Sequence, residues 1–515
     1  MSTSVVTRLR ATSRRRSGDR APLALVVPAV LAALAALAPL YYLGTIAFDR
    51  GASAVWEELW RRRTLDLVTR SLLLAASCTA ASLAIAIPGA WLVTRTDLRA
   101  RAVWRVLLAL PLAMPSYLAA FAWLSWREGL AGFWGAFLVL TSVSYPYAYL
   151  PVVAAFSRLE PAHEEVAQLH GRAGMWHLMM LSARQCRSAI AAGALLVALY
   201  VLSDFGAVAT MRYDTFTWVI FGAYRAGFNP SRAAILAALL VVIAVVLIVL
   251  EALARGRAVE THSDRTGQRS RTIPLGLRGL GAQVMLCAVI VVALLIPLWR
   301  IAGWSTRASE VGVSDVAMAL WGSVRYSLIA AALTVVLALP VALLVARSRS
   351  RSARWVEGSV YAAHALPGIV VAISMVFLGV RLVRSIYLEA PLLVLAYVVL
   401  FLPLAVGSLR AAAEQIPRTL EHVARSLGSA PLAVIRRVSL PLLLPGMAAG
   451  VALVTLAAMK ELPVTMLLRP TGSETLATRL WTSTTVSDYA NAAPYALALV
   501  FFVAIPTAII SGRGR

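Results

Sequence analysis

Three charged side chains stand inside long apolar stretches and are the residues of this chain best placed to act on an ion. Asp204 interrupts the run LYVLSDFGAVAT, and Lys460 and Glu461 interrupt LVTLAAMKELPVTM. Ionisable groups at membrane depth are costly, so each is by default a functional candidate. Two interpretations are open: the three residues line a cation path, or the carboxylates pair with Arg212, Lys460 or another helix and only fix packing.

The chain repeats itself at an offset of 257 residues, which places Asp204 on Glu461. The clearest copies are two hydrophilic loops, residues 162–190 and 420–446, set between apolar segments. The residues identical in both loops are Glu164 and Glu421, Val166 and Val423, Ala167 and Ala424, Gly171 and Gly428, Ala173 and Ala430, and Ser182 and Ser439. A short amphipathic helix, a glycine break and a second helix are predicted for each loop.

Both loops resemble the EAA loop of ABC-transporter permeases, in which Glu-Ala-Ala is followed by Gly and later by Leu-Pro. The second copy keeps Gly428, Leu440 and Pro441, whereas the first has Ala183 and Arg184 in place of Leu-Pro. The resemblance implies that each loop docks on a cytoplasmic ATPase subunit, and two loops imply two copies of it. The contact residues that it implies are Glu164, Glu165, Ala167 and Gly171 in the first loop and Glu421, Ala424, Gly428 and Pro441 in the second. An ordinary cytoplasmic loop with well-capped helices is the alternative.

The composition indicates a membrane protein. Of the 515 residues, 60% are hydrophobic and 14% are charged, and the mean hydropathy is +0.78. A soluble domain carries about 25% charged residues. The formal charge of +24 does not indicate nucleic-acid binding, because the arginines stand in short blocks between apolar spans, as the flanks of transmembrane helices require. The expected surroundings are membrane lipid.

The apolar segments predict an all-α integral membrane protein of about twelve transmembrane helices in two repeated six-helix halves. The expected organisation is a basic cytoplasmic N-terminus (1–21), a first permease half (22–254), a cytoplasmic linker (255–279) and a second half (280–515). The predicted spans are 22–47, 67–94, 103–126, 131–157, 187–210, 232–254, 280–302, 320–346, 356–380, 390–410, 442–467 and 491–511.

Arginine placement predicts that both termini and both loops are cytoplasmic. The triplet Arg61, Arg62 and Arg63 falls in an external loop against this rule, with a short surface helix expected over 56–66 and no function assigned. Prolines recur at matched positions of the two halves, which indicates either shared kinks around a central path or simple packing kinks. These pairs are Pro88 and Pro340, Pro115 and Pro367, and Pro151 and Pro403.

The chain is expected to be a transport subunit and not an enzyme. A P-loop needs Gly-Lys followed by Ser or Thr, but the one lysine, Lys460, stands between Met459 and Glu461. No cofactor or metal site is expected either. His163, His170 and His177 recur every seven residues, which places them about 10 Å apart on a helix, too far to share an ion.

The strings SDFGAVATMRYDTFTWVIF and MKELPVTMLLRPTGSETLATRLW are similar to bacterial ferric-iron permeases of the binding-protein-dependent type. The resemblance implies an ABC importer subunit of the bacterial inner membrane that moves ferric iron delivered by an external binding protein. Thiamine, phosphonate and polyamine ABC permeases are alternatives within the same class. A major-facilitator secondary transporter is the alternative from another class, because it too has twelve helices in two halves joined by a central basic loop.

Overall fold

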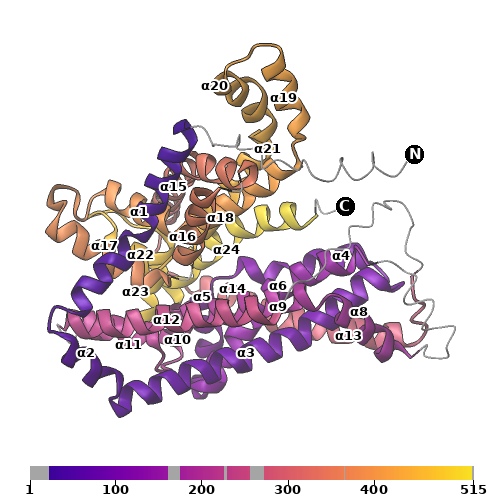
Figure 1. The fold of residues 1–515 in the computed structure, drawn as a ribbon. Helices are drawn as coiled ribbons and strands as arrows, with labels where there is room; N and C mark the ends of the chain where they lie inside the picture. Colours follow the sequence, from indigo (N-terminus) through magenta and orange to yellow (C-terminus); the bar gives the residue numbers. More distant parts are fainter. Residues whose placement is uncertain are drawn as a thin grey trace, which may run out of the picture. The chain divides into compact units, whose positions relative to one another are not determined.

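The computed structural model of the protein describes residues 23–159, 174–225, 229–255, 272–348, 350–364 and 366–512. Within these ranges every regular element is a helix, apart from one isolated bridge between Thr96 and Ile273 (Figure 1). The prediction of an all-α fold is therefore confirmed.

The helices of the first part of the chain alternate between long and short. They are α1 (Leu23–Ala47), α2 (Ala52–Leu59), α3 (Arg62–Arg95), α4 (Arg101–Leu107), η1 (Leu110–Ala113), α5 (Ser116–Trp126), η2 (Glu128–Leu130), α6 (Phe133–Phe156), α8 (Met175–Gln185), α9 (Arg187–Ser203), α10 (Gly206–Thr210), α11 (Phe216–Arg225) and α12 (Pro230–Arg255). The short surface helix expected over 56–66 is present a few residues earlier, as α2.

The second part of the chain follows a similar order. Its helices are α13 (Arg278–Ile290), η3 (Val291–Leu295), α14 (Ile296–Ser305), α15 (Val313–Arg347), α16 (Arg351–His364), α17 (Gly368–Arg381), η4 (Arg384–Ile386), α18 (Ala390–Gln415), α19 (Arg418–Ser426), α20 (Pro431–Val434), η5 (Ile435–Ser439), α21 (Leu440–Met459), α22 (Pro463–Leu468), α23 (Leu476–Thr485) and α24 (Tyr489–Gly512).

Nine spans in the described part of the chain are long and apolar enough to cross a membrane, and twelve if each bent helix pair counts as one span. The prediction of about twelve membrane helices agrees with this range. In one bent pair, residues 101–113 and α5 meet at 87°. Pro115 causes this break, because the residue before a proline is pushed out of the α region and Met114 is extended.

Only one of the matched proline pairs interrupts helices. Pro367 stands directly before α17, as Pro115 stands directly before α5. The other two pairs lie within continuous helices, namely Pro88 in α3, Pro340 in α15, Pro151 in α6 and Pro403 in α18.

The chain forms two compact units that do not follow sequence order. One unit comprises residues 1–38, 328–364 and 397–455, and its core includes Leu343, Ala413, Ile416 and Leu443. The other comprises residues 39–327, 365–396 and 456–515. In it, α3, α6, α9 and α12 pack lengthwise against one another (Figure 1).

One polar contact recurs in both parts of the chain. The backbone N–H of Phe216, at the start of α11, donates to Ser71 Oγ of α3 at 3.3 Å. The N–H of Leu476, at the start of α23, donates to Ser323 Oγ of α15 at 2.8 Å. Ser71 and Ser323 are 252 residues apart, the same offset as the matched proline pairs and five residues less than that of the loops, so the repeat extends from sequence to hydrogen bonding.

Two glycines at the repeat offset allow close helix packing. A Cβ on Gly193 of α9 would lie 2.8 Å from the Ala148 Cα of α6. A Cβ on Gly450 of α21 would lie 2.8 Å from the Ser408 Oγ of α18. Small residues let membrane helices approach this closely. The first obstacle is backbone and the second is a side-chain atom that can rotate, so the first site is the less tolerant one.

We expect Gly193→Ala to lower the free energy of unfolding by about 1–3 kcal/mol, the usual cost of overpacking. Gly450→Ala should cost less. Gly222→Ala in α11 is the matched control, because nothing lies within 4 Å of the added Cβ. Thermal unfolding of the purified protein checks the order. Equal melting temperatures for Gly193→Ala and Gly222→Ala would contradict the packing account.

Candidate functional site

The second EAA-like loop folds as the sequence predicts, as helix α19, a glycine break and a second helical segment. The break is a Schellman motif, in which the N–H of Gly428 donates to Arg425 O at 2.9 Å and the N–H of Ser429 donates to Ala424 O at 3.1 Å. Gly428 has a φ of +84°, a conformation that disfavours residues with a Cβ. Only glycine meets this requirement without strain.

Glu421 is buried against the rest of its own unit. Its Oε1 lies 2.9 Å from Arg347 Nη2 at the end of α15 and accepts a hydrogen bond from Ser439 Oγ at 3.2 Å. Arg347 Nη1 also donates to Ile416 O at 3.2 Å. These contacts attach α19 to the end of α15 and to η5, and the Glu421 side chain is only 12% exposed.

The solvent-facing side of α19 carries an apolar row that the sequence analysis did not single out. Leu420, Val423 and Leu427 are 45%, 57% and 80% exposed. Their i, i+3, i+7 spacing places them on one face of the helix, and this spacing is the signal that would have found them. We call these three residues the apolar row. Among the predicted contact residues, Ala424 is half-buried and Pro441 is exposed.

The predicted contact residues of the first loop, Glu164, Glu165, Ala167 and Gly171, lie outside the described residues, as do His163 and His170. The contact that introduces this loop is described. Arg95, at the end of α3, is buried and its Nη1 donates to Leu159 O at 3.3 Å. Arg95 and Arg347 correspond in the repeat, and so do Leu159 and Ile416, so the same arginine–carbonyl contact precedes both loops.

Asp204 lies at the break between α9 and α10. Its Oδ1 accepts hydrogen bonds from the N–H groups of Ala207 at 2.8 Å and Val208 at 3.4 Å. Its Oδ2 accepts a hydrogen bond from Ser116 Oγ at the start of α5. The carboxylate therefore caps the free N–H groups of α10 and ties that helix to α5.

Glu461 occupies the corresponding break between α21 and α22. Its Oε1 accepts a hydrogen bond from the N–H of Val464 at 3.1 Å. It also lies so close to Gly368 that a Cβ on that residue would be 2.6 Å from Oε1. Gly368 follows Pro367 as Ser116 follows Pro115, so each carboxylate caps a short helix and contacts the first residue after a helix-breaking proline.

The corner between η1 and α5 brings two of the predicted residues to one place. Lys460 Nζ donates to Leu112 O at 2.9 Å, and Asp204 contacts Ser116 four residues later. Neither carboxylate has an ion-pair partner within 4.0 Å among the described residues, so the pairing with Arg212 or Lys460, one of the two interpretations left open by the sequence, is not present there. Helix N–H groups take the place of cations.

The described residues contain no group of three or more His, Cys, Asp and Glu side chains able to hold a metal ion. Asp204 and Glu461 each turn one carboxylate oxygen to the N–H groups of a helix, which is an arrangement for holding helices in place.

Comparisons with known proteins agree with these features. The model of the family described as "Binding-protein-dependent transport system inner membrane component" matches residues 338–512. The Fe(3+)-transport system permease protein FbpB 2 of Haemophilus influenzae is 33% identical, over 95% of this chain and 98% of its own length.

Other relatives match shorter stretches. The molybdenum transport system permease protein ModB of Mycobacterium tuberculosis is 35% identical over 29% of this chain and 60% of its own length. The putative 2-aminoethylphosphonate transport system permease protein PhnV of Salmonella typhimurium is 37% identical over 17% of this chain and 32% of its own length. With the spans, the second loop and a relative matched almost end to end, the chain belongs to the family of binding-protein-dependent inner membrane components, the multi-pass permease subunits of ABC importers.

Proposed function

We propose that this permease moves ferric iron, delivered by an external binding protein and driven by a separate ATPase. The proposal of ferric iron as the substrate is supported by the alignment to an Fe(3+)-transport permease over nearly the whole of both chains. The molybdenum and phosphonate relatives align over 29% and 17% of this chain, so they support the class of transporter more than a substrate. Thiamine and polyamine have no such support, and family membership replaces the major-facilitator alternative.

The apolar row is the proposed contact with the ATPase. An exposed row of apolar side chains at i, i+3 and i+7 is suited to lie in a hydrophobic groove of a partner. Glu421 lies on another side of α19 and holds the helix through Arg347. In this proposal Gly428 and Glu421 shape the loop, and Leu420, Val423 and Leu427 make the contact.

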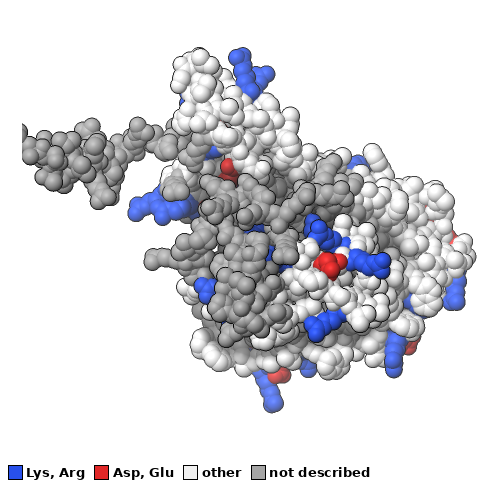
Figure 2. All heavy atoms as spheres, turned by 90° about the vertical axis from the view of Figure 1, so that its right-hand side faces the viewer, with Lys and Arg blue, Asp and Glu red and all other residues white. Residues whose placement is uncertain are grey.

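The orientation follows from the same assignment. Both loops, both termini and the linker at 255–279 would be cytoplasmic. The side of the molecule on which α4, α8 and α13 lie in Figure 1 supports this, because blue basic side chains are prominent on the face shown in Figure 2. Exposed arginines of these helices are Arg101, Arg184 and Arg278. An excess of arginine marks cytoplasmic segments.

The two-half organisation, residues 22–254 and 280–515, remains a proposal. The matched serine contacts of Ser71 and Ser323 and the matched arginine contacts of Arg95 and Arg347 support it. Two equivalent loops would engage two copies of the ATPase subunit.

Asp204, Lys460 and Glu461 are proposed to lie beside the translocation path and to act there by holding broken helices. Each carboxylate already accepts hydrogen bonds from the helix that it caps. Ferric iron prefers several oxygen donors, and high affinity would fall to the external binding protein.

The function is tested by uptake of radioactive iron into vesicles. The chain should support ATP-dependent uptake only together with its ATPase and binding protein. The permease purified without its partners should not hydrolyse ATP, since the P-loop lysine is missing and Lys460 instead contacts Leu112 O. ATP hydrolysis by the permease by itself, or uptake that responds to molybdate and not to iron, would contradict this proposal.

If the apolar row contacts the ATPase, substitutions in it should weaken docking of the ATPase without lowering the stability of the permease. Leu427→Glu should reduce co-purification of the ATPase at least about fivefold, because loss of an important apolar contact typically costs more than about 1 kcal/mol. His422→Glu adds the same charge to the same helix off the row and is the control. Melting temperatures of both variants should match that of the unsubstituted protein. Equal co-purification with the two variants would remove the row from the interface.

The carboxylate caps predict that shape matters more than charge. Asp204→Asn keeps an acceptor for the N–H groups of α10 and should retain most transport and stability. Asp204→Ala removes the cap and should cost about 1 kcal/mol of stability. Glu461→Gln and Glu461→Ala should show the same order at α22. Iron uptake per folded molecule and melting temperature are measured together. Loss of uptake in the Asn and Gln variants at normal stability would show that the charge itself is required.

A further inference from the structure

A charged notch of about 140 Å³ opens at the start of α3. Arg63, Asp66 and Arg70 line it from one face of α3, Asp214 lines it from the loop before α11, and Arg232 lines it from α12. These five residues define the charged notch. Arg63 belongs to the arginine triplet for which the sequence offered no function.

Four of the five charges are free. Arg63, Asp66, Arg70 and Asp214 are exposed, and in the part of the chain that the structure describes none has an ion-pair partner within 4.0 Å. Arg232 is different, because its Nε donates to Glu58 Oε1 at 2.8 Å and joins α12 to α2.

The walls of the charged notch are held in place by other groups. Tyr213 donates its hydroxyl to Arg70 O at 3.4 Å, and Phe216 donates its N–H to Ser71 Oγ at 3.3 Å. The backbone around the notch is therefore held by hydrogen bonds, and four of its charged side chains make no ion pair within the described part of the chain. A preformed charged surface binds a complementary partner without the cost of ordering the backbone.

The second half closes the same place with its own chain. At the offset of 252 residues, the α3 positions 63, 66 and 70 correspond to Asp315, Met318 and Gly322 of α15. A Cβ on Gly322 would lie 2.1 Å from Glu474 O, so the loop before α23 lies directly on this helix. In the first half, Arg70 stands at that position and the loop before α11 is three residues shorter, counted from Arg212 to Thr215 against 469–475.

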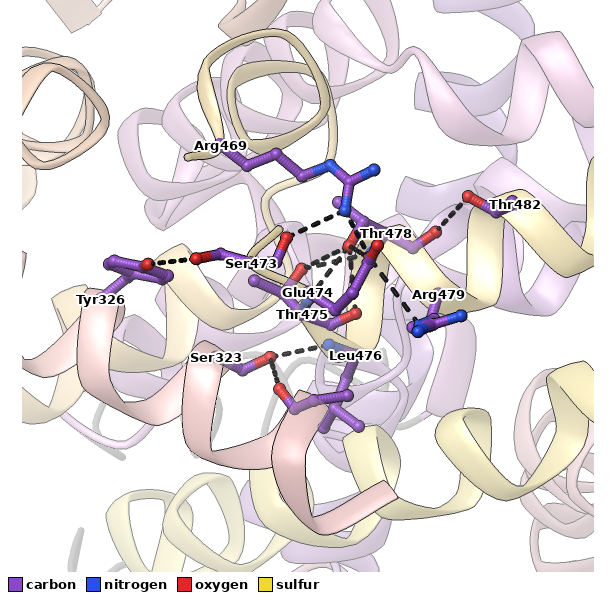
Figure 3. A network of polar contacts seen from close by, with 11 residues as sticks. Ser323, Tyr326, Arg469, Ser473, Glu474, Thr475, Leu476, Thr478, Arg479 and Thr482 are labelled. Atoms are coloured by element: carbon purple, nitrogen blue, oxygen red, sulfur yellow. Dashed lines mark hydrogen bonds and ion pairs between the residues drawn. The ribbon is translucent and has the colours of Figure 1, made fainter. Parts of the chain in front are cut away.

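The closing loop shows which group is held there. Glu474 Oε2 lies 2.5 Å from Arg469 Nη1 and 3.8 Å from Arg479 Nε, and it accepts a hydrogen bond from Thr478 Oγ1 at 3.1 Å (Figure 3). Arg469 corresponds to Arg212 of the first half. The second half thus supplies a carboxylate to its own arginines, and the first half leaves its arginines open.

The side of the membrane follows from α3. Its 34 residues span about 50 Å, more than the hydrocarbon core, so its two ends lie on opposite sides. Arg95 at one end contacts Leu159, which leads into the first EAA-like loop. The charged notch is at the other end, away from the ATPase.

We propose that the charged notch is the docking site for a loop of the external binding protein that carries charges of both signs, with a carboxylate of that loop held between Arg63 and Arg70 as Arg469 and Arg479 hold Glu474. The inference rests on the proposed function and extends it to a surface. Asp66 and Asp214 disfavour a phosphate headgroup in the same notch, whereas a protein loop with charges of both signs satisfies all four free groups.

The test uses the permease–ATPase complex in phosphatidylcholine nanodiscs, with the ferric-binding protein that supports iron uptake as the probe. The double variant Arg63→Glu, Arg70→Glu should weaken binding at least about tenfold, because like charges across an interface cost several kcal/mol. Arg63→Gln with Arg70→Gln should weaken it less. Met318→Glu, which adds one negative charge at the exposed α15 position corresponding to Asp66, is the control and should bind as the unsubstituted complex does.

A charge exchange completes the test. One carboxylate of the binding protein, changed to arginine, should restore affinity for the double glutamate variant. Unchanged affinity of that variant, or an equal loss with Met318→Glu, would overturn the docking site while leaving the importer function intact. No binding by the unsubstituted complex would overturn the proposed function and the notch with it. Added phosphatidylglycerol could instead raise the melting temperature of the unsubstituted complex but not that of the double glutamate variant. That result, with equal affinity of the two for the binding protein, would assign the notch to lipid.

Discussion

A helix that begins within a membrane leaves its first backbone N–H groups with no water to accept their hydrogen bonds, and this constraint bears on two helix breaks of the permease. Helices α9 and α21 both end next to a carboxylate, and the short helices α10 and α22 begin beyond it. Asp204 and Glu461 supply the missing acceptors to Ala207, Val208 and Val464. Because a single carboxylate serves both as cap and as contact to the next helix, the break and the packing around it are one feature.

The residue that each carboxylate contacts follows directly after a proline. Pro115 and Pro367 end one helical direction and start another, which exposes Ser116 and Gly368 at the first turn of α5 and α17. The hydroxyl of Ser116 donates a hydrogen bond to Asp204, whereas Gly368, which has no side chain, leaves space for the longer Glu461. The repeat therefore preserves the spatial relation of carboxylate, break and proline while the residues that realise it differ. A shorter acid needs a donor to reach it, and a longer acid needs space.

The sequence predicts what depends on local pattern. Apolar length locates the spans, and the glycine in the second loop marks a turn that requires positive φ, as Gly428 has. Which residue a side chain contacts depends on how distant segments of the chain pack together, and the sequence was less informative about this. Glu421 was expected to contact the ATPase, and the sequence did not indicate its contact with Arg347, 74 positions away in the chain. The caps at Asp204 and Glu461 were missed for a related reason, because apolar surroundings suggested an ion pair and backbone N–H groups carry no sequence signature.

The two ends of the long helices α3 and α15 have diverged to different degrees. At one end, Arg95 and Arg347 keep the same contact with the carbonyls of Leu159 and Ile416. At the other end, Ser71 and Ser323 keep a common anchor, but Arg70 stands where Gly322 admits the backbone of Glu474. Two copies of one ATPase would require two similar loops, which keeps the first end alike. A single binding protein would present two different surfaces to the two proposed halves, so nothing would require the second end to match. A fused chain would allow this difference, because each half has its own stretch of sequence. One half can then vary at one end without changing the other.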